Sequence, residues 1–129
     1  MCLLAILVVE DEVMIRMLVA DTLRDEGYEV VEAANGDEAT AVLLSGHQID
    51  LVLTDVRMPG QVDGIQLAMH AKELDPSRPV IVTSGHLPPE AARRMDDFLR
   101  KPFSLSTMLG MVTKLIGPSC QTKTQQRTA

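Results

Sequence analysis

Residues 3–9 read LLAILVV, an unbroken apolar run that stops at three acidic residues, Glu10, Asp11 and Glu12. A strand with one face in water alternates apolar and polar side chains, so a run of this kind is typical of a strand buried on both faces. Such a strand needs a covering layer on each side of its sheet. The run is too short to span a bilayer and has no basic segment before it, so we interpret it as neither a membrane span nor a signal peptide.

The rest of the chain alternates strand-like with helix-like segments. Apolar spacing and end signals such as Gly27, Asn35 and Ser104 define the helices. This order predicts one α/β domain with a parallel sheet covered on both faces, which binds ligands at the carboxyl ends of its strands. We expect the domain to occupy residues 1–116 and residues 117–129 to form a disordered tail. The predicted strands are 3–9, 28–33, 50–54, 79–83 and 98–100; the predicted helices are 13–26, 35–45, 64–74 and 104–116, with only about two helical turns over 89–95 between the last two strands.

Composition limits the partners and the compartment. The chain has 18 acidic and 12 basic residues, a net charge of -6, which disfavours direct contact with nucleic acid or an anionic membrane. Cys2 and Cys120 show no disulfide or metal-ligand pattern, so we expect a cytoplasmic protein. Aromatic residues are scarce, so methionines should help to fill the core. These are Met14, Met17, Met69, Met108 and Met111, whereas His47 and His70 should lie on the surface.

Charged residues follow three of the predicted strands. Glu10 and Asp11 follow the first strand, Asp55 the third and Lys101 the fifth. If these strand ends converge, the carboxylates repel one another unless a divalent cation and an ammonium neutralise them. Mg²⁺ suits such a site because it binds a few carboxylate oxygens and leaves room for phosphate. A carboxylate beside Mg²⁺ and a lysine can act as a nucleophile toward a phosphoryl group.

The sequence resembles the receiver domains of two-component response regulators over about residues 3–116. The matching residues are Glu10-Asp11 after ILVV, Asp55 in TDVRMPG, a later Asp63-Gly64, a hydroxyl residue closing PVIVTSG, and Phe98, Lys101 and Pro102 in FLRKPF. The resemblance implies a chemotaxis-regulator-like fold, a doubly wound five-stranded parallel sheet in the flavodoxin-like order 2-1-3-4-5. It also implies a bacterial signalling protein.

The resemblance also implies roles for these residues. Asp55 accepts a phosphoryl group from the phosphohistidine of a histidine kinase or a histidine phosphotransfer protein. Mg²⁺, or Mn²⁺, is held by Glu10, Asp11, Asp55 and the backbone carbonyl of Arg57. Lys101 pairs with the phosphoryl oxygens, and a cis bond joins it to Pro102.

The switch residues of the family match less directly. Thr83 and Ser84 are adjacent, and strand alternation lets only one of them face the site. The family's usual spacing from Gly64 favours Ser84, with Thr83 as the alternate. Phe98 stands in the place of the switch aromatic residue, while Arg57 and His86 stand where side chains tune hydrolysis of the phosphorylated state.

The chain departs from the family pattern in three places. Glu10 replaces the more frequent Asp, and the turn between Pro59 and Gly64 is one residue longer than usual. The segment from Ser84 to Lys101 is short and contains Pro88-Pro89, so we expect a shortened fourth helix. The family's usual dimer depends on that helix, so the oligomeric state stays open.

We therefore expect a phosphoacceptor that switches contacts with an unidentified downstream protein and is not an enzyme with a separate substrate. The alternatives are a degenerate receiver acting as a static interaction platform, and a receiver piece of a longer regulator or hybrid kinase. An aspartyl phosphatase lacks its second Asp here, and a flavodoxin-like cofactor module lacks its phosphate-binding loop. Each feature taken alone also has an ordinary structural interpretation. The acidic run fits a solvated helix start. Asp55 fits a helix or turn cap, Lys101 a surface lysine, and Thr83 and Ser84 ordinary strand-end hydroxyls.

Overall fold

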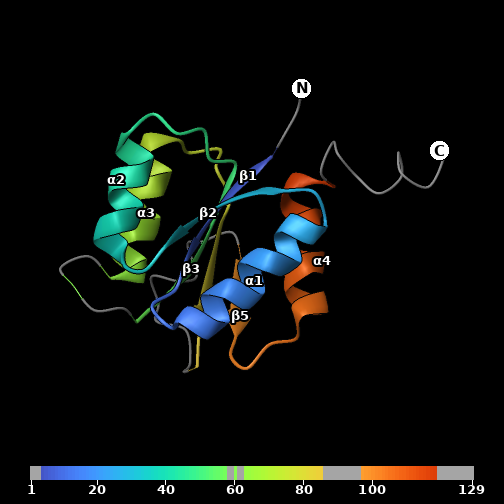
Figure 1. Ribbon diagram of the computed structural model, residues 1–129. Helices are drawn as coiled ribbons and strands as arrows, with labels where there is room; N and C mark the ends of the chain where they lie inside the picture. The colour runs from blue at the N-terminus through green and yellow to red at the C-terminus, as the bar shows by residue number, and fades with distance from the viewer. Residues whose placement is uncertain (1–3, 58–59, 61–62, 86–96, 119–129) are drawn as a thin grey trace.

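The computed structural model describes residues 4–57, 60, 63–85 and 97–118 (Figure 1). In these residues five parallel strands form one sheet in the order β2-β1-β3-β4-β5, which confirms the predicted α/β fold and strand order. The shortened helix predicted before β5, His86, the longer turn at Gln61-Val62 and most of the predicted tail lie outside the described residues. The elements are β1 (Ala5–Val9), α1 (Val13–Asp25), β2 (Glu29–Ala33), α2 (Gly36–Leu44), β3 (Leu51–Asp55), α3 (Gly64–Leu74), β4 (Val80–Ser84), β5 (Asp97–Arg100) and α4 (Leu105–Ile116).

Helices cover both faces of the sheet. The helices α2 and α3 lie on one side, and α1 and α4 on the other (Figure 1). Every residue of β1, β3 and β4 is buried, as the unbroken apolar run at the start of the chain predicted. Successive side chains of β1 enter opposite core layers, Leu7 on the α2 and α3 side and Val8 on the α1 and α4 side. Among the described residues, no helix is long and apolar enough to cross a bilayer.

Part of the predicted methionine core is wrong. Met14 is 80% exposed, and Met17 and Met69 are each about half exposed, whereas Met108 is fully buried. In α1 the buried residues are Val19, Ala20 and Leu23. Apolar residues are spread around most of the first half of this helix, so their spacing alone does not identify the face that packs on the sheet. Val13, Met14, Met17 and Leu18 instead form an exposed apolar surface, the α1 outer surface.

Gly64 allows α3 to begin directly against the end of β3. A Cβ atom at position 64 would overlap the carbonyl oxygen of Asp55 and lie 2.7 Å from the Cα of Val56. The Gly64 amide donates a hydrogen bond to the Val56 carbonyl (3.0 Å). A capping box between Asp63 and Gln66 fixes the start of the helix at this point. The close approach therefore closes the loop that follows Asp55.

We expect Gly64→Ala to lower the free energy of unfolding by about 2–3 kcal/mol, because backbone atoms must move to admit the methyl group. The control is Gly110→Ala on α4, where the added Cβ would meet nothing within 4 Å apart from its own residue, the adjacent residues and the backbone of its own helix. There alanine should raise stability by about 0.5–1 kcal/mol, because glycine is a poor helix former. Urea denaturation measures both values, and equal effects of the two substitutions would contradict the close-approach explanation.

Candidate functional site

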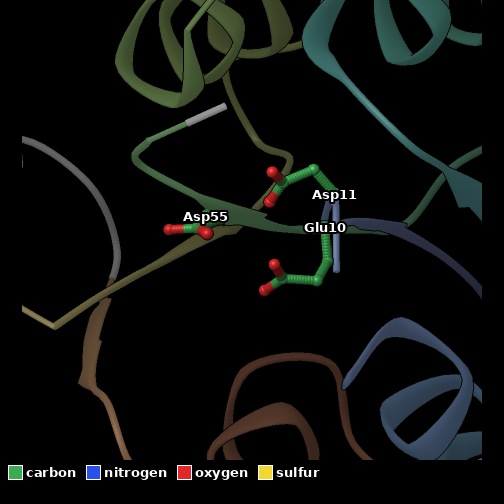
Figure 2. Close-up of side chains that lie close together, drawn as sticks. All are labelled: Glu10, Asp11 and Asp55. Carbon is green, nitrogen blue, oxygen red and sulfur yellow. The ribbon is translucent and has the colours of Figure 1, made fainter. Parts of the chain in front are cut away.

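Three carboxylates meet at the carboxyl ends of β1 and β3 (Figure 2). Glu10 and Asp11 directly follow β1, and Asp55 is the last residue of β3, so the pairing of these two strands brings the acids together. Glu10 is 4% and Asp55 8% exposed, while Asp11 is exposed. One oxygen of each lies within 4.8 Å of the other two. The structure thus brings together three of the predicted ligands, in a cluster that could hold a metal ion.

Lys101 joins two of these carboxylates. Its ammonium donates to Glu10 Oε1 and to Asp55 Oδ2, each at 2.9 Å. The lysine follows β5 and reaches across the end of β4, to which its backbone amide is bonded at the Ser84 carbonyl (2.8 Å). The predicted cis bond between Lys101 and Pro102 is present.

The charges of this cluster do not balance. Burial raises the pKa of Glu10, and the neighbouring Asp55 raises it further, despite hydrogen bonds from Lys101 and the Glu12 amide that act the other way. Burial alone would lower the pKa of Lys101, but its bonds to Asp55 and Glu10 outweigh burial and raise it. The lysine therefore stays cationic, and its single charge faces three carboxylates. A second cation would be needed to balance the charge of the three carboxylates.

The size of the cluster fits Mg²⁺. This ion binds oxygen at about 2.0–2.1 Å, so oxygens on opposite sides of it lie about 4.2 Å apart. The carboxylate oxygens, within 4.8 Å of one another, come close to that spacing. The three carboxylates would supply up to three of its six ligands, and the remainder would be other oxygens such as waters. The role of the Arg57 carbonyl stays a prediction, although the Arg57 amide donates to Asp55 Oδ1 (3.3 Å).

The strand register separates the two candidate hydroxyls. Thr83 pairs with Asp55 across β3 and β4, and paired residues of parallel strands point to the same face. Thr83 also lines a small pocket together with Glu10 and Asp55. Ser84, preferred from the sequence, is the next residue and points to the opposite face. Both hydroxyls lie at the carboxyl end of β4, so the choice of Ser84, with Thr83 as the alternate, stays a prediction.

Phe98 lies on the other side of the sheet from the acids. It pairs with Val82 and packs, half-buried, against the core layer of α2 and α3. Its switch role stays a prediction, as do the hydrolysis-tuning roles of the exposed Arg57 and of His86, which is not among the described residues.

The sequence analysis missed Arg16. Its guanidinium reaches from α1 to the backbone carbonyl of Glu10 (2.8 Å). No signal in the sequence marks this contact, because an arginine on an amphipathic helix is normally a solvent-facing residue.

Comparisons with known proteins agree with this geometry. A family model described as the response regulator receiver domain matches residues 6–113. The transcriptional regulatory protein PdtaR of Mycobacterium tuberculosis is 40% identical over 112 residues, which cover 81% of this chain and 52% of PdtaR. The chain thus spans about half the length of this curated relative.

Solved structures extend the likeness to the fold. A response regulator receiver protein from Sinorhizobium medicae superposes with a TM-score of 0.82 and 35% identity, over 88% of this chain and 94% of that one. The response regulator TrrA from Thermotoga maritima, solved in complex with Mg²⁺ and BeF, superposes with a TM-score of 0.80 and 32% identity, over 88% and 99% of the two chains.

Removing the lysine should reveal the cost of the buried carboxylates. In Lys101→Met, Glu10 and Asp55 lose their shared cation, so we expect the free energy of unfolding at neutral pH to fall by about 3 kcal/mol. The folded-state pKa of Glu10 lies above its ordinary value of 4.5. The ionised form of such a carboxyl destabilises the folded state above the folded-state pKa. This destabilisation is lost as the pH falls through that pKa, so the stability difference between Lys101→Met and wild type should shrink in mildly acidic buffer.

The matched control is the double variant Lys101→Met with Glu10→Gln. It removes one of the two uncompensated carboxylates, so part of the lost stability should return at neutral pH. Urea denaturation at neutral and at mildly acidic pH measures the free energy of unfolding of wild type, the two single variants and the double variant. A double variant no more stable than Lys101→Met would show that repulsion between the carboxylates is not the cause.

Proposed function

The chain belongs to the response regulator receiver domain family of two-component systems, and we propose that its Asp55 accepts a phosphoryl group from a phosphohistidine. The donor is a histidine kinase or a histidine phosphotransfer protein. The observation that carries this proposal is the placement of Asp55, a buried carboxylate 2.9 Å from the Lys101 ammonium and beside two further acids. A bound divalent ion, Mg²⁺ or Mn²⁺, would neutralise the carboxylates and the incoming phosphoryl oxygens.

The transfer needs little from the protein beyond position and charge. A carboxylate oxygen of Asp55 attacks phosphorus, the bond from phosphorus to the histidine nitrogen breaks, and the imidazole leaves. Lys101 already donates to Asp55 and to Glu10. It can therefore turn one hydrogen bond toward a phosphoryl oxygen without moving its backbone. The hydroxyl of Ser84, with that of Thr83 as the alternate, is our candidate for a second donor.

The product, an aspartyl phosphate, changes the contacts of the protein with a downstream partner. We propose no separate substrate, no direct contact with nucleic acid or membrane, and a cytoplasmic site of action. Because PdtaR is about twice as long as the stretch that matches, the same site would also serve as the receiver of a longer regulator or hybrid kinase.

Acetyl phosphate with Mg²⁺ should add one phosphoryl group to the chain, because a small donor needs no docking surface. Intact-mass spectrometry should find a base-labile adduct that is absent in Asp55→Asn. The control Asp25→Asn removes an exposed carboxylate at the end of α1 and should keep the adduct. No adduct on the wild-type chain, or one that survives Asp55→Asn, would contradict the proposal.

Beryllofluoride with Mg²⁺ mimics the aspartyl phosphate and separates a switch from a static platform. We expect it to shift the backbone amide resonances of Thr83, Ser84 and Phe98, while Arg78 at the opposite end of β4 stays unchanged. Unchanged spectra at all of these positions would favour the static platform.

The α1 outer surface is where we propose that the donor protein docks. It borders a cavity of about 520 Å³ whose walls include Leu18, Phe103 and Lys101. Since Lys101 also binds Asp55, a partner seated here lies beside the phosphoacceptor. The exposed methionines of α1 suit the apolar face of a partner helix.

Substituting Met14→Gln and Leu18→Gln together should slow phosphotransfer from a protein donor by about tenfold. The donor for this assay is a histidine kinase first shown to phosphorylate the wild-type chain. Labelling by acetyl phosphate should be unchanged. The control, Leu44→Gln with Leu74→Gln, removes two exposed leucines from α2 and α3 and should leave both rates unchanged. An equal loss in the control, or a loss with both donors, would exclude docking on the α1 outer surface.

A further inference from the structure

Arg16 on α1 is directed inward, toward the segment that carries two of the acids. Its side chain is 17% exposed. The guanidinium donates from Nη1 to the backbone carbonyl of Glu10 (2.8 Å) and from Nε to Glu32 Oε1 on β2 (3.3 Å). One side chain therefore connects α1, the end of β1 and β2.

The contact fixes the peptide that leads into Asp11. The Glu10 amide donates to the Ala33 carbonyl of β2 (3.1 Å), so the backbone of Glu10 is held through its amide by β2 and through its carbonyl by Arg16. Because a peptide unit is planar, holding the carbonyl of Glu10 also fixes the orientation of the Asp11 amide. Asp11 is the most exposed of the three acids, so its direction depends strongly on its backbone.

Glu32 forms ion pairs with both Arg16 and Arg24, so Arg24 can serve as the comparison for Arg16. Its second oxygen accepts a hydrogen bond from Arg24 Nη1 (3.0 Å), and Arg24 also donates to the Val30 carbonyl (3.2 Å). The hydrogen bonds of Arg24 go to β2, and none reaches Glu10 or Asp11 among the described residues. The two arginines share one carboxylate, but only Arg16 holds the backbone at the acidic cluster.

We propose that Arg16 is a positioning residue for the divalent cation: it holds the Glu10-Asp11 peptide in the orientation that directs the Asp11 carboxylate toward Asp55. This inference rests on the proposed function, since it concerns the metal that phosphoryl transfer would require. Groups that orient metal ligands commonly change metal affinity by about tenfold or more when removed.

Electrostatics alone predicts the opposite sign. Removing a positive charge near a cation site should strengthen cation binding, because repulsion between the two cations falls. If Arg16 positions the ligands, its removal should weaken binding instead. The direction of the change therefore distinguishes a positioning residue from a neighbouring charge.

The experiment compares Arg16→Met with Arg24→Met in the full chain. The Mg²⁺ dissociation constant, measured from backbone amide chemical shifts, should rise about tenfold in Arg16→Met and stay within about twofold of wild type in Arg24→Met. Thermal unfolding checks that both variants fold, and Arg16→Gln replaces Arg16→Met if the latter does not. With acetyl phosphate, the Mg²⁺ concentration for half-maximal rate should rise while the rate at saturating Mg²⁺ is kept.

Unchanged or tighter Mg²⁺ binding in Arg16→Met would overturn the inference and leave the proposed function intact. Equal weakening in Arg24→Met would also overturn it, since the effect would then belong to the shared ion pair with Glu32. A wild-type chain that binds no Mg²⁺ would overturn the proposed metal site itself, and this inference with it.

Discussion

The Lys101 ammonium, held between Glu10 and Asp55 at 2.9 Å from each, is the interaction on which the site depends. A buried carboxylate without a partner is unfavourable by several kcal/mol, and two of them side by side are worse. The strand order β1-β3-β4-β5 of the parallel sheet brings the carboxyl ends of β1 and β3 within reach of an ammonium that follows β5. The compensation is incomplete, because Asp11 adds a third negative charge. That residual charge makes the site suited to a cation and then to a phosphoryl group.

The fold followed from the sequence because burial on both faces leaves a clear pattern. LLAILVV, LVLTD and PVIVTS each lack the alternation of a half-exposed strand, and in a parallel sheet such strands are covered by helices on both faces. Strand ends were less certain. β3 includes Asp55 and β4 includes Ser84, one residue beyond each predicted end. A shift of one residue reverses the face on which a side chain lies, so the register, which pairs Thr83 with Asp55, could not be read from the predicted strand ends alone.

The sequence could not reveal contacts that depend on how α1 is rotated against the sheet. Met14 and Met17 have the spacing of core residues, yet they are exposed, because Val19, Ala20 and Leu23 fill the space against the sheet. Arg16 has the spacing of a surface residue, yet it binds the Glu10 carbonyl. Both errors have one cause. Apolar periodicity shows which faces of a helix could be buried. Tertiary packing decides which of these faces is buried.

The rotation of α1 also places the proposed docking surface and the proposed positioning residue Arg16 on one short stretch of helix. Arg16 faces the end of β1, while its neighbours Met14, Met17 and Leu18 face outward. Leu18 and Lys101 line the same cavity, and Lys101 holds Asp55. A partner on the α1 outer surface would therefore border a cavity that Lys101, a hydrogen-bond partner of Asp55, also lines. Any effect of an α1 substitution on phosphotransfer must for that reason be divided between docking, which a small phosphoryl donor bypasses, and the metal ligands, which it does not.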